Sequence, residues 1–176
     1  DMMEDTGIVR RIDELGRIVV PKEMGKNLRI NTGDNVEIYM DENNKIVLKK
    51  YSTLFGMEEE LFNIAKVINE TSNATIIITD IDKIIVSYGK GSELYIDQYI
   101  DKSLIENHPI QTVIKKRNVT IVAGQVEPRL TYIFPLYSKD MLHGFLILIE
   151  NERSLQNCEN EIALYFKKFI LKQLDN

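Results

Sequence analysis

The sequence predicts two domains, a strand-rich one over residues 3–52 and a mixed α/β one over residues 53–176. Two observations lead to this division. Short runs of β-favouring residues, separated by turns, fill the first fifty residues. Beyond them, apolar residues recur at three- and four-residue steps, the period of a helix, and strand and helix patterns then succeed one another to the end of the chain.

The first half of the first domain is predicted to form two strands and a short helix. Residues 6–12 and 17–20 are rich in β-branched side chains and flank the turn-like sequence D-E-L-G. Pro21 can begin a helix that continues to Leu28, because the first helical turn does not need the N–H that proline lacks.

The second half of this domain is predicted to form a hairpin. Apolar and polar residues alternate over 36–41, which indicates a half-buried strand, and a turn over 41–45 leads into a strand over 46–48. A unit of fifty residues without a cysteine or a metal-ligand pattern buries too little apolar surface by itself. We therefore expect a second copy of the chain to complete its core.

The second domain is predicted to be a mixed α/β sandwich. Its first helix is indicated by the repeat of Leu54, Met57, Leu61, Ile64 and Ile68. We then expect, in order, strands over 74–80 and 83–89, a helix over 110–116, strands over 118–124, 130–137 and 144–150, and a last helix over 157–174. Ser103 and Glu106 have the spacing of a capping box ahead of the middle helix.

Composition restricts the function. The net charge of −5 argues against a protein that coats nucleic acid indiscriminately, although a local basic patch is compatible with it. The single cysteine, Cys158, cannot form an intramolecular disulfide, which fits a reducing cytoplasm. No apolar run reaches the ~18 residues of a membrane span. Asp1 and Met2, which precede Met3, are interpreted as a remnant of expression.

Basic residues concentrate between Gly7 and Ile30, where six of them stand against three acidic residues. Arginines in a strand-and-turn unit can contact phosphates or base edges in the major groove of DNA. The alternative is a solvated surface whose arginines pair with the neighbouring acids. Composition alone leaves both interpretations open.

The motifs of this region resemble one family closely and nearly without gaps. TGIVRRIDELGRIVVPKEM, followed by LRINTGDNVEIYMDENNKIVLKKY, is similar to the AbrB-type transition-state regulators. The second domain is similar to a GAF domain in length and element order. The resemblance implies a dimer in which hairpins of two chains are swapped, and a looped-hinge face that reads DNA shape more than a fixed base sequence. It also implies control of sporulation-stage genes, as activator or repressor, from a nucleoid-associated protein.

The resemblance assigns DNA-binding roles to Arg10, Arg11, Arg17 and Lys26. This chain departs from the family at Gly25, where arginine is usual, so one charge per protomer is missing. In GAF-like dimers the first and last helices pair across the interface, which implies a tetramer through five residues: Leu61, Ile64, Ile68, Phe166 and Phe169. A cup beside the sheet could hold an unidentified small molecule near Tyr88, Tyr95 or Tyr132, although aromatic residues there more often serve packing.

No pattern in the sequence predicts catalysis, a cofactor or a metal. Asp80 and Asp82 are interpreted as hairpin-turn acids, since no third ligand is close in the sequence. His108 and His143 share no ligand spacing, and a surface or capping role is expected for each. Gly89-Lys90-Gly91 lacks the strand–loop–helix pattern of a phosphate cradle, and Cys158 is expected to pack rather than react.

The sequence thus predicts a DNA-binding transcriptional regulator that is not an enzyme, with double-stranded DNA and itself as partners. An antitoxin with the same N-terminal fold is the alternative. Such a protein is expected to carry a disordered tail in place of a folded second domain.

Overall fold

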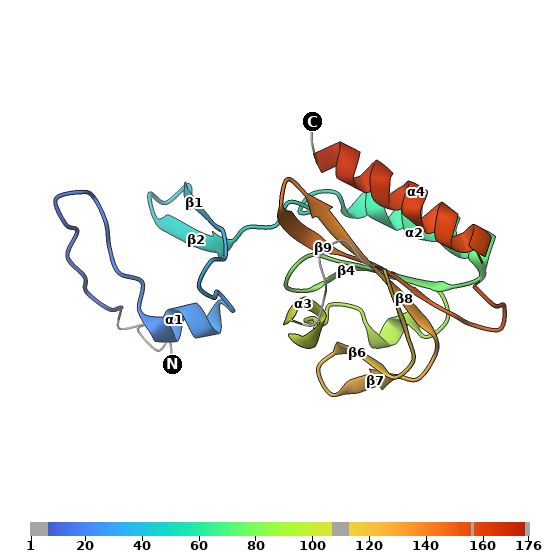
Figure 1. Ribbon diagram of the computed structural model, residues 1–176. Coiled ribbons are helices and arrows are strands. Elements are labelled where there is room, and N and C mark those ends of the chain that lie inside the picture. Colours follow the sequence, from blue (N-terminus) through green and yellow to red (C-terminus); the bar gives the residue numbers. More distant parts are fainter. Residues whose placement is uncertain (1–6, 107–112, 156, 175–176) are drawn as a thin grey trace. The chain divides into compact units, whose positions relative to one another are not determined.

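The computed structural model describes residues 7–106, 113–155 and 157–174, with the side chains of 157–160 and 162 left aside. The chain divides into two compact units whose boundary lies between Tyr51 and Ser52. The first unit has one two-stranded sheet, and the second has a five-stranded and a two-stranded sheet; we describe the units separately (Figure 1).

The first unit contains one short helix and one hairpin. Helix α1 covers Lys22–Asn27, directly after Pro21, as predicted. Strands β1 (Val36–Met40) and β2 (Ile46–Lys50) pair antiparallel, with Ile38 opposite Leu48, which confirms the predicted hairpin.

The two strands expected over 6–12 and 17–20 are absent from the described residues of this single chain. Residues 7–20 run out and back without a strand ladder (Figure 1), and hydrogen bonds join them only at the turn, where the Asp13 N–H donates to the Arg17 carbonyl at 3.0 Å. Their apolar side chains have no surface to pack against within the chain. A strand that packs against nothing gains too little from pairing to offset the entropy of ordering it.

None of the described residues between 7 and 51 is buried. The expectation of a half-buried strand over 36–40 is therefore wrong for one chain, because all five residues of β1 are exposed. Ile38 and Met40 each expose 68% of their surface. Exposed apolar side chains in such a continuous stretch are typical of a surface that another protein covers.

Contacts to both the helix and the hairpin fix the end of α1. Arg29 follows the helix with a φ of 56°, and the Ile30 N–H donates to the Gly25 carbonyl at 2.8 Å, the bond that closes a helix whose next residue is left-handed. The Lys50 Nζ of β2 donates to the Arg29 carbonyl at 3.1 Å and lies 3.6 Å from the Asp34 carboxylate. These bonds attach the helix to the hairpin without a hydrophobic core.

The second unit is built on a five-stranded antiparallel sheet with the order β4-β3-β9-β8-β5. The strands are β3 (Thr75–Thr79), β4 (Ile84–Tyr88), β5 (Ile114–Lys116), β8 (Thr131–Ser138) and β9 (Met141–Ile149). Helices α2 (Glu58–Ser72) and α4 (Asn157–Leu174) lie side by side on one face (Figure 1). The remaining elements are η1 (Ser92–Leu94), α3 (Ser103–Glu106), β6 (Val119–Val122) and β7 (Gln125–Glu127).

Successive residues of the central strands serve two cores, because strand side chains alternate between faces. In β3, Ile76 and Ile78 belong to the core under α2 and α4, whereas Ile77 belongs to the core that includes Leu104 of α3. Continuous apolar strands such as IIIT and FLILI are typical of a sheet covered on both faces.

A close approach between strands requires Gly144 of β9. A Cβ at this position would lie 1.8 Å from the carbonyl oxygen of Thr79. No side chain fits at that distance from a backbone atom, so the glycine allows β9 to pack against the end of β3.

Most predicted elements of the second domain are confirmed. The last helix spans Asn157–Leu174, as expected, and the two strands of the first hairpin are present as β3 and β4. The helix predicted over 110–116 is wrong in its last turn, since Ile114–Lys116 form β5; residues 107–112 lie outside the described residues. β5 and β7, with three residues each, are too short to show a pattern in the sequence.

Candidate nucleic-acid interface

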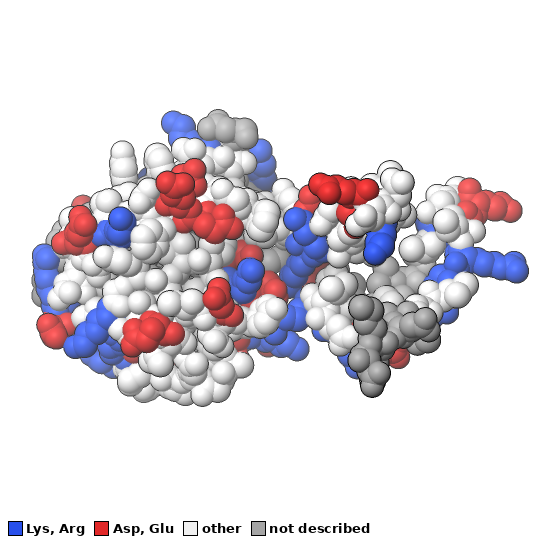
Figure 2. Space-filling model, turned by 180° about the vertical axis from the view of Figure 1, so that it is seen from behind, with Lys and Arg blue, Asp and Glu red and all other residues white. Residues whose placement is uncertain are grey.

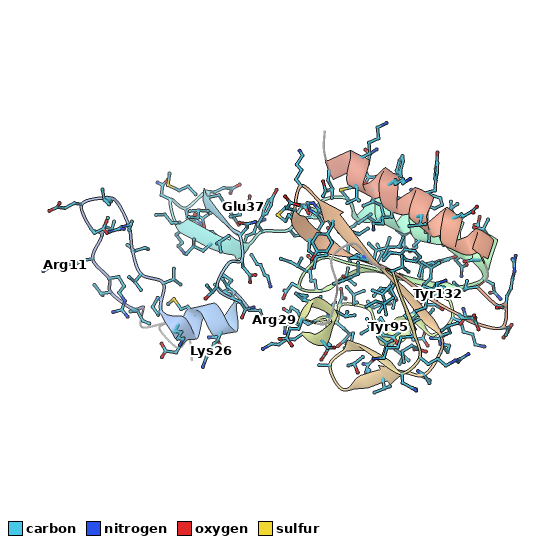
Figure 3. All side chains as sticks on the ribbon, viewed as in Figure 1. Arg11, Lys26, Arg29, Glu37, Tyr95 and Tyr132 are labelled. Atoms are coloured by element: carbon cyan, nitrogen blue, oxygen red, sulfur yellow. The ribbon has the colours of Figure 1, made fainter. Side chains whose placement is uncertain are left out.

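The residues predicted to bind DNA all lie in the first unit and are all exposed. Arg10, Arg11 and Arg17 belong to the extended stretch of residues 7–20, and Lys26 belongs to α1. Figure 3 shows Arg11 pointing away from the extended stretch and Lys26 projecting from the helix. Figure 2 shows Lys and Arg side chains of the first unit reaching into solvent.

The turn over residues 13–17 holds Arg17 in a defined position. Its Nε donates to Asp13 Oδ2 at 2.7 Å, and 72% of the Arg17 side chain remains exposed. Asp13 Oδ1 accepts the N–H groups of Leu15 and Arg17 at 2.9 and 2.8 Å. The bonds from the Arg17 backbone and side chain hold the pKa of Asp13 below its ordinary value, so the pair is ionised at neutral pH.

The alternative raised for the arginines, pairing with neighbouring acids, is thus observed for Arg17 and Asp13. This pair was not predicted from the sequence. Its signal was an acid and an arginine at the two ends of a D-E-L-G-R turn, which a hairpin brings face to face.

Helix α1 places Lys26 in its last turn, where a positive charge suits the helix dipole. Gly25, where the resemblance leads us to expect arginine, has a helical backbone without a positive φ. A Cβ there would meet only the Ile30 carbonyl oxygen, at an ordinary contact distance of 3.7 Å. The structure therefore accommodates a larger residue at position 25.

Three residues predicted for the tetramer contact lie in the hydrophobic core of the second unit instead. Leu61, Ile64 and Ile68 of α2 are buried in the core of their own chain, with at most 7% of their surface exposed, so they offer no surface to a second copy. The apolar stripe of α2 packs on the sheet instead. Phe166 is half-buried against the same core, and Phe169 is 46% exposed.

The three tyrosines considered for a ligand site do not surround one cavity. Tyr132 and Tyr88 pack with the core under α2 and α4, whereas Tyr95 packs with the core on the other face of the sheet. The Tyr132 hydroxyl donates to the Leu155 carbonyl at 2.7 Å, and Tyr88 makes an edge-on contact with Phe62. Packing, the commoner role, is the one they fill.

A buried ionic cluster surrounds Tyr95 instead. Its hydroxyl donates to Glu127 Oε2 at 2.7 Å, and Arg129 Nε donates to Glu127 Oε1 at 2.6 Å. Burial raises the pKa of the Glu127 carboxyl, but the hydrogen bonds from Arg129 and Tyr95 outweigh it, and the pKa lies below its ordinary value. Burial and the bond to Glu127 raise the pKa of Tyr95. Each polar group is satisfied internally, as expected of a structural cluster.

The residues considered for chemistry have structural roles where they are described. Asp80 Oδ1 accepts the N–H groups of Asp82 and Lys83, both at 2.7 Å, as predicted for a hairpin-turn acid. His143 Nδ1 lies 2.6 Å from the Thr53 hydroxyl. His108 and the side chain of Cys158 lie outside the described residues. Within the described parts of the chain no group of three His, Cys, Asp or Glu residues is placed to hold a metal.

A hollow of about 170 Å³ opens among α3, β5 and β6, with Ser103, Lys116 and Thr120 in its lining. It is smaller than the cavities of ~300 Å³ and more that hold drug-sized ligands. Nowhere in the described residues does a helix combine the length and the apolar character needed to cross a bilayer.

Sequence comparisons find relatives for the N-terminal part of the chain and for nearly its whole length. Residues 9–54 match the family described as "Antidote-toxin recognition MazE, bacterial antitoxin". The chain is 27% identical to stage V sporulation protein T of Bacillus subtilis (strain 168), over 98% of this chain and 99% of that protein. It is 55% identical over 49 residues to the transition state regulatory protein AbrB of the same organism, which is 28% of this chain and half of AbrB.

The second unit has a counterpart among solved structures. The GAF domain of Thermosynechococcus elongatus PixJ, in its blue-light absorbing form, aligns with 72% of this chain and 90% of its own length, with a TM-score of 0.53 and 17% identity. At this identity the likeness concerns the fold alone, and it confirms the GAF-like fold predicted for the second domain. The chain therefore combines an N-terminal AbrB-type domain with a C-terminal domain of GAF-like fold.

Proposed function

We propose that this protein is a transcriptional regulator that binds double-stranded DNA through its first domain, residues 3–52, and oligomerises through its second, residues 53–176. The observation that carries the proposal is the exposed basic stretch from Gly7 to Ile30. It has a net charge of +3 in a chain of −5. Its five most N-terminal basic residues are exposed. The similarity to AbrB and to stage V sporulation protein T, whose names describe regulation and sporulation, supports the same function.

In this proposal Arg10, Arg11, Arg17 and Lys26 contact phosphates and the edges of the major groove. A protein that relies mainly on phosphate contacts tolerates different sequences and selects by shape and deformability. Stage-specific genes of sporulation are the proposed targets, and the proposed location is the nucleoid in the cytoplasm.

Self-association is part of the proposed function. The first unit has no buried side chain in the described stretch from 7 to 51, so it needs a cover for its apolar surface. A second copy that contributes residues 7–20 as paired strands would supply the missing cover, in a swapped-hairpin dimer. Two such dimers on one assembly would gain affinity for DNA through avidity.

For the tetramer contact we propose exposed residues of α4, because the residues of α2 that were predicted for it are buried. Tyr165 is 72% exposed and Phe169 is 46% exposed, and their spacing of four places them on the same face of the helix. We propose this face, with Phe169 retained from the sequence analysis, as the contact between second domains.

The test of DNA binding is Arg17→Ala. We expect loss of binding in gel shifts at moderate salt, with an unchanged oligomer mass, because Arg17 is the last residue of the turn and its ion pair with Asp13 is exposed. Each phosphate contact removed should reduce the slope of log K against log salt by about 0.9. Binding equal to wild type would contradict the proposal, as would full DNA binding by residues 52–176 alone.

A sensory role of the second domain is a further part of the proposal, with the hollow near Ser103 as its support. We expect a metabolite of few heavy atoms to raise the melting temperature of the full chain. A thermal-shift screen checks this, with Thr120→Leu, which fills the hollow, as the variant that should abolish the shift.

An antitoxin is the second candidate, because the matched family description includes bacterial antitoxins. The folded second unit, with its own two cores, favours the regulator, since an antitoxin is expected to carry a disordered tail there. We expect the native protein to purify as a homo-oligomer. A stoichiometric second protein that arrests growth when expressed alone would favour the antitoxin.

A further inference from the structure

Two turns of the first unit share one construction. One is D-E-L-G-R over residues 13–17 and the other is D-E-N-N-K over residues 41–45. In both, Oδ1 of the first residue accepts the N–H groups of the third and fifth residues, at 2.9 and 2.8 Å in the first turn and at 2.9 Å twice in the second. In both, the N–H of the first residue donates to the carbonyl of the fifth at 3.0 Å.

The fourth residue also agrees, because both turns need a left-handed backbone there. Gly16 has a φ of 76° and Asn44 a φ of 58°. The residues that follow are similar as well, I-V-V after the first turn and I-V-L after the second. The bonds to the backbone N–H groups are thus sufficient to explain an aspartate at the start of each turn.

The turns differ in what the fifth side chain can do. Arg17 uses Nε to bond Asp13 Oδ2 at 2.7 Å, and its two terminal nitrogens remain for another partner. The Lys45 ammonium has three donors on one nitrogen, but it has no planar pair of donors like the outer edge of a guanidinium. Asp13 therefore uses one carboxylate oxygen for the backbone and the other for the arginine.

We propose that Asp13 is a positioning residue for the DNA contact of Arg17. This inference rests on the proposed function. The carboxylate fixes the direction of a side chain that is 72% exposed and would otherwise adopt many rotamers. The outer edge of the guanidinium, a planar pair of donors, matches a phosphate or the O6 and N7 of guanine.

The same carboxylate acts against indiscriminate binding. It brings a negative charge to the tip of the turn, where it repels phosphates that do not lie in line with the guanidinium. Asp13 thus raises discrimination between duplexes by favouring one geometry and disfavouring the others.

The experiment compares Asp13→Asn with Asp41→Asn in the full chain. An asparagine retains an oxygen that can accept the two backbone N–H groups, so both variants keep the cap, but only the first removes an ion pair. Affinity is measured for a duplex selected by the wild-type chain from a random pool and for a scrambled duplex of equal composition. Circular dichroism and oligomer mass control for folding.

We expect the ratio of the two affinities to fall about fivefold in Asp13→Asn, the size expected when one long side chain is no longer pre-ordered. Arg17→Lys, which gives the first turn the side chain of the second, should lower the ratio similarly while its charge is kept. Asp41→Asn should leave the ratio unchanged.

The proposal is overturned if Asp13→Asn keeps the wild-type ratio, if Asp41→Asn lowers it equally, or if the wild type does not discriminate at all. Arg17→Ala separates this inference from the proposed function. Loss of binding in Arg17→Ala together with a wild-type ratio in Asp13→Asn refutes the positioning role alone. Unchanged binding in Arg17→Ala refutes the DNA contact itself.

Discussion

The two units of this chain solve the problem of apolar surface in opposite ways. The second unit encloses its apolar residues in two cores, one on each face of its sheet. The first unit has comparable apolar residues along its strands, yet none of its described residues is buried. One unit is thus complete as a single chain, whereas the other has the hydrogen bonds of a hairpin and a helix without a core.

This difference teaches where the stability of each unit comes from. Apolar burial within the chain stabilises the second unit at any protein concentration. In the proposed assembly the first unit depends on association, so its stability is expected to vary with concentration by mass action. The same dependence would couple folding to the proposed DNA contacts, because Arg10 and Arg17 belong to the stretch that lacks a ladder in the single chain.

The largest effect is expected from a charge placed on the apolar surface of the first unit. Ile38→Asp, at a residue that is 68% exposed in the single chain, should abolish association of the first domains, since the charge would be buried without a partner. Loss of paired binding sites should reduce DNA affinity by about 100-fold or more, because linked sites gain roughly that much affinity through avidity. Sedimentation and gel shifts measure the two effects.

The control is Val126→Asp in the second unit, which is 61% exposed and of similar character. This change should leave mass and DNA affinity unaltered if only the first unit needs a cover. Equal effects of the two substitutions would remove the contrast between the units.

The sequence predicted that both units have apolar faces that are covered. It could not predict whether the same chain or another chain covers each face. The alternation over Val36 to Met40 predicts that one face of a strand is covered, and says nothing about whether the cover comes from the same chain. The apolar stripe containing Leu61, Ile64 and Ile68 posed the same question, and there the cover is the chain's own sheet. Periodicity indicates that a face is buried; it does not identify the partner.

The hydrophobic pattern of the sequence could not predict short elements and side-chain pairs, for another reason. β5 has three residues and is defined by its pairing with β8, a contact distant in the sequence. The turn at residues 13–17, by contrast, was predicted, because the need of Gly16 for a positive φ is local. The bond from Arg17 to Asp13 depends on how that turn folds the chain back.

An intermediate effect is expected from Glu127→Gln in the second unit. Glu127 is buried and accepts bonds from Arg129 and Tyr95, so removal of its charge should lower the free energy of unfolding by about 2 kcal/mol at pH 7. Because the pKa of Glu127 is lowered in the folded state, its contribution is present above its ordinary value of 4.5 and is lost as pH falls through the lowered pKa. Urea unfolding at pH 7 and below pH 4 measures the difference between wild type and variant, which should narrow in acid.

Glu152→Gln provides the matched control on the same unit. Glu152 forms an exposed ion pair with Lys90 at 3.0 Å, and such pairs contribute only ~0–1 kcal/mol. A Glu127→Gln variant no less stable than Glu152→Gln would show that the buried cluster does not stabilise the second unit.

The smallest effect is expected from Gly25→Arg, which adds the charge that the resemblance to AbrB-type regulators leads us to expect at this position. The helical backbone and the 3.7 Å distance from a Cβ to the Ile30 carbonyl oxygen accommodate the change. Removal of a glycine should stabilise α1 by about 1 kcal/mol. An added phosphate contact should steepen the salt dependence by about 0.9 in log K per log salt, so affinity should rise most at low salt.

Gly25→Ala stabilises the helix equally and adds no charge. If both variants bind DNA with the same affinity and salt slope, the gain comes from folding of the first unit, and position 25 makes no contact with the duplex.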